Sequence, residues 1–266
     1  MKVYLTGGDG NGWALDEDLH FTREALSTLE GITFVQSTRE AEVVHSVWSA
    51  NLMKYNEKNL AGKKIICHMN ASTIATLKET RWLELSRLVG KWVVQSYQDE
   101  GIFRQMGMSA CRIAYCVRDD IFMPLPKKKI EIRSELGFEK DDYVIGNFMR
   151  DSLGEDLRLT KPEKCPELFF SIVKDLHRRG NPVKVLLGGP RRHWMRSALK
   201  EAGVPFVFIG DIKEEEDYPQ NILSRSKLNE LYSAMNVLLV TSRSEGGLNL
   251  KVLFTILALF SFLHHN

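Results

Sequence analysis

Short apolar runs recur along the chain between helical patterns, and this alternation predicts an α/β protein. In the first half the predicted strands are Lys2–Thr6, Ile32–Gln36, Glu42–Ser46, Lys63–His68, Lys91–Gln95 and Arg112–Cys116. Helical spacing of apolar residues separates them, over Leu15–Leu29, Ile74–Val89 and Gln98–Met106. Nearly continuous apolar strands are typical of parallel sheets that helices cover on both faces. The pattern therefore predicts right-handed βαβ units in a doubly wound sheet.

The segment Asp119–Lys129, DDIFMPLPKKK, interrupts the pattern and predicts a linker, because its prolines continue neither a helix nor a central strand. A second series follows, with helices at Ile130–Leu136, Pro166–Arg179, Arg192–Ala202 and Lys227–Met235 and strands at Tyr143–Phe148, Val183–Leu187, Phe206–Ile209 and Val237–Thr241. We expect two Rossmann-like domains, residues 1–124 and 125–266, with parallel sheets that face each other across a cleft. The second has about four predicted strands against six, so we expect it to be truncated.

Composition narrows the class of protein. The chain has 266 residues, of which 44% are hydrophobic and 26% charged, as is typical of a soluble globular protein. A formal net charge of +2 argues against nucleic acid as a partner. The four cysteines form no CxxC pair, which favours reduced thiols in the cytoplasm. The chain starts directly with strand-like MKVYLTGG, so we expect no signal peptide, and the longest apolar run, Val252–Leu263, is too short to span a bilayer.

Two features of the first domain could carry chemistry. Gly8, Gly10 and Gly12 follow the first strand in the loop TGGDGNGW, where backbone N–H groups can approach a phosphate or a sugar closely. The loop lacks the GxGxxG fingerprint of dinucleotide-binding proteins, and a flexible turn is the alternative. His68 ends a predicted strand, at the edge where open α/β sheets bind ligands. It could bond a sugar hydroxyl or carry a proton, or serve a structural role.

The second domain has polar turns after three predicted strands. Arg150 follows the first strand, and Lys161 and Lys164 precede a helix, so the three cations can converge on a diphosphate at one sheet edge. The other two turns contribute Gly189, Arg191, Ser242, Glu245, Gly246 and Gly247. A carboxylate beside two glycines suits sugar hydroxyls, with glycine N–H groups near a phosphate. Solvated charges are the alternative for each turn taken alone.

These segments together resemble the retaining glycosyltransferases of family 4 (group 1 glycosyltransferases), which have the GT-B fold. Residues 236–247, NVLLVTSRSEGG, are similar to the family's apolar strand followed by S-R-x-E-G and then Gly or Phe. Residues 144–151 resemble its G-x-x-x-R segment, and residues 117–124 resemble its G-V-D-x-x-x-F-x-P hinge with Cys116 in place of the first glycine. KCPELF at residues 164–169 resembles K-G-P-D-L-F, with Cys165 in place of glycine. The resemblance covers residues 1–247.

The resemblance implies a nucleotide-diphosphate sugar as donor and assigns roles to these residues. Arg150 and Lys164 would neutralise the diphosphate leaving group, with Lys161 as the competing lysine, and Glu245 would bind donor-sugar hydroxyls. His68 would lie near the reacting sugar. The residues implied to line the donor site are Gly8, Gly10, Gly12, Lys161, Gly189, Arg191, Ser242, Gly246 and Gly247. The implied reaction is a front-face displacement in which protein cations stabilise the leaving group, so neither a metal nor a cofactor is expected.

The tail departs from the family pattern. Leu253 stands where the E-x(7)-E motif has its second glutamate, so we expect weakened donor binding and an incomplete enzyme. The alternatives are a non-catalytic nucleotide- or sugar-binding remnant of the fold and a nucleotide-sugar epimerase; the missing GxGxxG argues against a dehydrogenase. The acceptor could be a glycan, a lipid or a small molecule. Peripheral membrane contact and self-association stay open as further partners.

Overall fold

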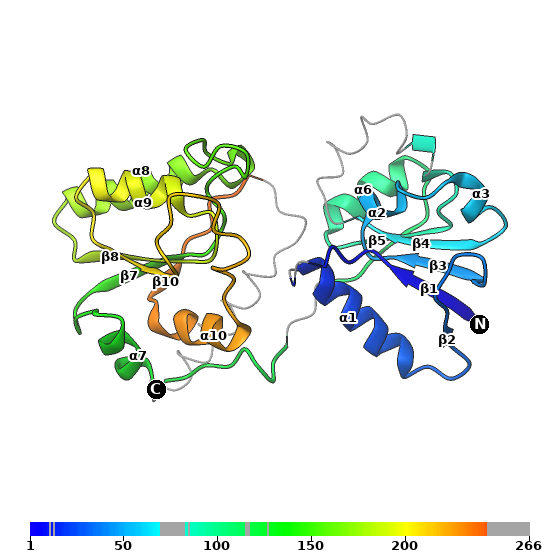
Figure 1. Ribbon diagram of the computed structural model, residues 1–266, viewed down its shortest axis with the longest axis horizontal. Coiled ribbons are helices and arrows are strands. Elements are labelled where there is room, and N and C mark those ends of the chain that lie inside the picture. Colours follow the sequence, from blue (N-terminus) through cyan, green and yellow to red (C-terminus); the bar gives the residue numbers. More distant parts are fainter. Residues whose placement is uncertain are drawn as a thin grey trace. The chain divides into compact units, whose positions relative to one another are not determined.

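The computed structural model describes residues 1–10, 12, 14–69, 83–84, 86–114, 118–126 and 128–243. These residues form two compact units, unit 1 up to residue 114 and unit 2 from residue 118 to residue 243. Each unit contains one sheet whose paired strands are all parallel (Figure 1). The predicted α/β class with two parallel sheets is confirmed. Glu245, Gly246, Gly247 and the apolar tail lie outside the described residues.

Unit 1 has a six-stranded sheet in the order β2-β1-β3-β4-β5-β6. The strands are β1 (Lys2–Thr6), β2 (Thr33–Phe34), β3 (Val43–Ser46), β4 (Lys64–His68), β5 (Lys91–Val94) and β6 (Ala110–Arg112). The helices include α1 (Ala14–Ser27), α2 (Ser49–Leu52), α3 (Glu57–Leu60) and α6 (Tyr97–Gln105). Figure 1 shows α1 on one face of this sheet and α2 and α6 on the other. Trp92 and Phe103 are buried in the core between the sheet and α6.

Unit 2 has a four-stranded sheet in the order β10-β7-β8-β9 among the described residues. The strands are β7 (Tyr143–Asn147), β8 (Val183–Gly188), β9 (Phe206–Ile209) and β10 (Val237–Leu238). The helices are α7 (Lys129–Glu135), the 3-10 helix η1 (Pro162–Lys164), α8 (Pro166–Arg178), α9 (His193–Glu201) and α10 (Arg225–Ala234). One face packs against α8 and α9 through Phe169 and Leu199, and the other against α7 and α10 through Ile132 and Leu231 (Figure 1).

Two of the predicted strands have different bounds in the structure. The strand predicted at Arg112–Cys116 is wrong: β6 starts earlier, because its ladder with β5 pairs Trp92 with Ala110. The strand predicted at Val237–Thr241 is shorter in the structure, because the pairing of β10 with β7 ends at Leu238. The predicted helix Ile74–Val89 lies largely outside the described residues. The other predicted elements agree to within two residues, and the four-residue helices α2 and α3 and the short η1 were missed.

Two further findings concern the cysteines and the helices. The described cysteines Cys67, Cys111 and Cys165 are free thiols. None of the helices in the described ranges is both long enough and apolar enough to cross a bilayer.

The strand orders fix where each unit is suited to bind a ligand. In unit 2 the chain moves from β7 to β8 on one side and later to β10 on the other side of β7. In unit 1 it moves from β1 to β2 and then to β3 on the opposite side of β1. Such reversals open a crevice outside the carboxyl ends of the strands, where open α/β sheets bind ligands. A ligand site is therefore expected at the turns that follow β1, β3, β7 and β10.

Gly146 in β7 gives a test of the packing beneath that edge. A methyl group at this position would lie 1.6 Å from Sδ of Met235, a buried residue that follows α10. We expect Gly146→Ala to lower the free energy of unfolding by about 1–3 kcal/mol, because a close-packed core must shift to accept the group. Urea denaturation measures the loss.

The matched control is Gly101→Ala in α6, where nothing lies within 4 Å of the added methyl group. Because alanine is the better helix former, this change is expected to be neutral or stabilising by up to about 1 kcal/mol. Equal losses in the two variants would contradict the packing argument.

Candidate functional site

The turn after β7 lies beside the backbone of the two lysines predicted to bind an anion with Arg150. The backbone N–H of Lys161 donates to the carbonyl oxygen of Asp151 at 2.8 Å, so the segment before η1 lies beside Arg150. The backbone N–H of Lys164 donates to the carbonyl oxygen of Lys161 at 3.0 Å. Arg150 and Lys164 are half-buried, and the ammonium of Lys161 pairs with Glu163 at 2.7 Å. The turn after β7 and the residues before η1 thus bring the backbones of three cationic residues to one edge of the sheet.

The segment after β10 joins the same edge. Oγ1 of Thr241 lies 3.1 Å from the carbonyl oxygens of both Lys164 and Cys165. Oγ of Ser242 donates to Sδ of Met149 at 3.0 Å, one residue before Arg150. The backbone N–H of Arg243 donates to the carbonyl oxygen of Glu163 at 3.1 Å. The exposed Arg243 is a further cation here, and sequence reasoning did not assign it a role.

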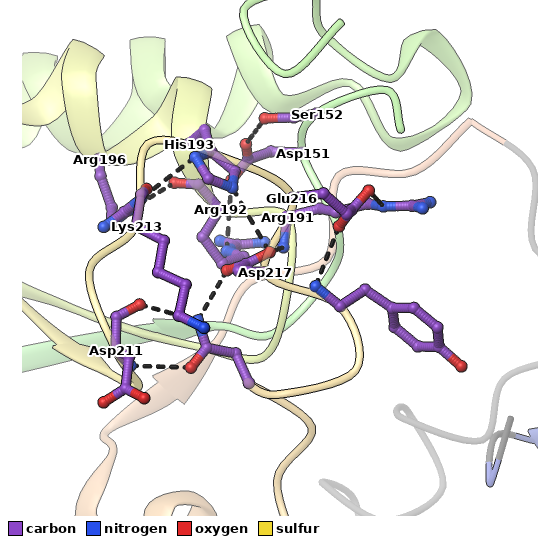
Figure 2. Close-up of polar contacts among 12 residues, drawn as sticks. Asp151, Ser152, Arg191, Arg192, His193, Arg196, Asp211, Lys213, Glu216 and Asp217 are labelled. Atoms are coloured by element: carbon purple, nitrogen blue, oxygen red, sulfur yellow. Dashed lines mark hydrogen bonds and ion pairs between the residues drawn. The ribbon is translucent and has the colours of Figure 1, made fainter. Parts of the chain in front are cut away.

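The turn after β8 meets this edge through its backbone. The carbonyl oxygen of Arg191 accepts from the N–H groups of Asp151 at 3.1 Å and Ser152 at 3.3 Å. Gly189 has a φ of +87°, and a methyl group there would have only the carbonyl oxygen of Phe148 near it, at 3.9 Å. The Arg191 guanidinium donates to Glu216 at 2.8 Å instead (Figure 2). The backbone of Gly189 and Arg191 therefore lies at this edge of the sheet. The Arg191 side chain instead contacts the acidic loop that contains Glu216 and Asp217.

A buried ion pair lies behind these turns. Arg192 is 0% exposed, and its Nε lies 3.3 Å from Oδ2 of Asp151. Oδ1 of Asp151 accepts from Oγ of Ser152 at 2.8 Å and from the N–H of Met195 at 3.3 Å, and Oγ of Ser152 accepts from the N–H of Trp194 at 3.0 Å. Burial raises the pKa of Asp151, an effect that Arg192 opposes, and burial lowers the pKa of Arg192. Sequence reasoning missed this pair.

Cys165 has a backbone conformation that is unusual for a cysteine. It precedes α8 with φ 45° and ψ 55°, in the left-handed region that glycine adopts without a steric penalty. Pro166 then opens the helix at a position where its missing N–H costs nothing. The position therefore favours glycine, and the cysteine keeps the same backbone, with its Sγ 3.3 Å from the carbonyl oxygen of Pro162.

In unit 1 the glycine loop is turned towards a carboxylate of its own chain. Asp16 in the first turn of α1 accepts from the N–H of Gly10 at 3.1 Å and of Gly12 at 2.6 Å. A methyl group at Gly8 would lie 2.5 Å from Oδ1 of Asp16. Partial burial acts to raise the pKa of Asp16, but these N–H groups hold it below its ordinary value. Sequence reasoning missed Asp16, although an acidic residue in a first helical turn is a recognised anion at such N–H groups.

His68 at the end of β4 faces a second histidine. Its Nε2 lies 2.9 Å from Nε2 of His45, which β3 contributes. One nitrogen must donate and the other accept, so this bond requires that the two rings are not both protonated. Burial, and for His68 also the charge of His45, lowers the pKa of His68 to about 3 and burial lowers that of His45 to about 4. Sequence reasoning did not single out His45.

Comparison with known proteins adds the fold family. No family model and no curated protein sequence matches the chain. A UDP-forming α,α-trehalose-phosphate synthase from Burkholderia xenovorans, in complex with glucose-6-phosphate, is similar with TM-score 0.59 and 12% identity, over 91% of this chain and 60% of that chain. A Rickettsia africae glycosyltransferase is similar with TM-score 0.54 and 11% identity, over 94% of this chain and 62% of that chain. The chain has the fold of GT-B glycosyltransferases.

A third solved structure, WaaG, a glycosyltransferase involved in lipopolysaccharide biosynthesis, is similar with TM-score 0.50 and 11% identity, over 95% of this chain and 65% of that chain. The chain thus spans less than two thirds of the length of these three structures. At such identities the likeness extends to the fold alone.

The histidine pair predicts a pH dependence of stability. Because both folded-state pKa values lie below that of a free imidazole, the unfolded chain binds more protons than the folded chain between about pH 4 and 6.5. Stability therefore rises with pH across this window. We expect urea denaturation to show a loss of about 2–4 kcal/mol for unit 1 between pH 7.5 and pH 5, up to about 2 kcal/mol from each histidine.

The double variant His45→Gln/His68→Gln should flatten this dependence, and His20→Gln, which changes an exposed histidine of α1, should leave it unchanged. A wild-type profile that stays flat from pH 7.5 to pH 5 would argue against a neutral buried pair.

Proposed function

We propose that the chain is a retaining glycosyltransferase that moves a sugar from a nucleotide-diphosphate sugar to an acceptor hydroxyl. The observation that supports the proposal is that the backbone segments of Arg150, Lys161 and Lys164 meet at the edge where β7 and β10 end. This edge is the ligand-binding crevice of a doubly wound sheet. The chain also shares its fold with solved glycosyltransferases.

The cations suit a diphosphate leaving group. Negative charge grows on the diphosphate as its bond to the sugar breaks, and fixed guanidinium and ammonium groups stabilise that charge. The N-terminus of α8, directly after Lys164 and Cys165, adds partial positive charge at the same place. In the overall exchange the acceptor oxygen bonds to the sugar, and the acceptor's proton leaves with the nucleoside diphosphate. Metal is not needed for neutralisation in this scheme.

The remaining assignments belong to the same proposal. His68, as a neutral ring, would bond the reacting sugar, and the loop of Gly8, Gly10 and Gly12 would help to line the donor site. Glu245, Gly246 and Gly247 would bind the donor sugar and its phosphate. The trehalose-phosphate synthase is described as UDP-forming, which supports testing a uridine diphosphate donor first.

Substitution of the cations tests the donor site. We expect Arg150→Ala and Lys164→Ala each to raise the Kd of a nucleoside diphosphate about tenfold or more, because charge-assisted contacts to phosphate contribute roughly 1.5–3 kcal/mol each. Titration calorimetry with UDP, ADP and GDP measures the effect. The control is Arg179→Ala, which removes an exposed guanidinium that follows α8 and pairs with Asp175.

Binding that is unchanged in both variants, or weakened as much in the control, would remove the assignment. An assay of donor hydrolysis and sugar transfer then separates an enzyme from a non-catalytic remnant, since the remnant would bind the nucleotide sugar without consuming it.

A further inference from the structure

Burial of the charges of Asp151 and Arg192 costs desolvation free energy, so stability alone does not explain the pair. Arg192 is 0% exposed and Asp151 is 1% exposed, so both charges have lost their hydration. Replacement of a buried ion pair by apolar side chains of similar volume is often neutral or stabilising. Such a pair is then better explained by the geometry that it fixes than by the stability that it adds.

The pair fixes the geometry of the turns that form the proposed anion site. The N–H of Asp151 donates to the carbonyl oxygen of Arg191, and the carbonyl oxygen of Asp151 accepts from the N–H of Lys161. Asp151 therefore links the turn after β7, the turn after β8 and the segment before η1. Arg150, the cation proposed to meet the diphosphate, is its direct neighbour in the chain.

The side chain of Asp151 holds this junction in place. One carboxylate oxygen accepts from Oγ of Ser152 (Figure 2). The same oxygen accepts from the N–H of Met195 in α9, and the other oxygen faces Arg192. Arg192 follows Arg191 directly, so one short segment places a guanidinium beside the Asp151 carboxylate and a carbonyl oxygen at the Asp151 N–H. This segment in turn is tied to the acidic loop by the N–H of Arg191, which donates to Asp217 at 2.7 Å.

We propose that Asp151 and Arg192 are positioning residues that hold the backbone of Arg150 and Lys161 in the arrangement that binds a diphosphate. The identity of the ligand rests on the function proposed above. Arg192 has no exposed surface and does not touch the ligand, so it acts through Asp151. A site that is already ordered loses less conformational freedom on binding, so loss of the pair weakens binding even where the fold is kept.

The test uses the full chain and a double variant, Asp151→Asn/Arg192→Met. Asparagine keeps an oxygen for Ser152 and Met195, and methionine fills the buried volume without charge, so the variant is expected to fold. We expect its Kd for UDP, ADP or GDP, whichever binds the wild type, to rise about tenfold in calorimetry. Val173→Ala, at a fully buried position of α8, is the control for lost stability and should stay within about twofold of the wild type.

Amide hydrogen exchange gives a second measurement that needs no ligand. In the double variant the amides of Asp151 and Lys161 should exchange at least about tenfold faster, and in Val173→Ala they should change no more than the amides of β8. Arg192→Met alone provides an independent variant with the same expected direction. Wild-type exchange rates and wild-type Kd in the double variant would overturn the proposal.

The two proposals fail in different ways. A wild-type chain that binds none of the three nucleotides contradicts the proposed function, and the exchange rates of Asp151 and Lys161 still decide whether the pair orders the turns. If the wild type binds a nucleotide and the double variant binds it equally tightly, only the positioning role is contradicted.

Discussion

The parallel pairing of β7 with a neighbour on each side is the constraint on which the rest of unit 2 depends. Tyr143 pairs with Val183 and Ile145 with Val237, so the three strands end at one edge. The segments that follow them must then share the space beyond that edge, and their backbones bond to each other there. The gathering of cations is a consequence of this pairing, because each cation lies in a segment that the sheet delivers to the edge.

The two units differ in the charged groups that lie at their strand ends. In unit 1 the N–H groups of the glycine loop face the carboxylate of Asp16, and the histidines beside β3 and β4 are neutral. In unit 2 the corresponding edge gathers arginine and lysine from three segments. A highly charged anion therefore suits unit 2 far better than unit 1. This asymmetry agrees with a division of labour between a donor site and an acceptor site, as in the proposed function.

Much of the fold and part of the site could be predicted from the sequence, because both follow from local patterns. Apolar runs identify the strands, and a polar turn after a strand in a parallel sheet must lie at the carboxyl edge, which located Arg150 and Lys164. The pairing of His45 with His68 depends on the order of β3 and β4 and has no local signal. The sequence also does not show which of the adjacent residues Arg191 and Arg192 is buried. In the structure Arg191 pairs with Glu216 of the acidic loop, and Arg192 is the buried one.

Cys165 has a consequence for the unfolded chain as well as for the folded one. A cysteine at a left-handed position is strained when folded, but it also has fewer conformations than glycine when unfolded, so it loses less backbone entropy on folding. The two effects oppose each other, and the contact of Sγ with the Pro162 carbonyl adds a link across η1 that glycine cannot form. A cysteine at this left-handed position is thus compatible with a stable turn beside the proposed phosphate site. It also leaves a thiol, 8% exposed, next to that site.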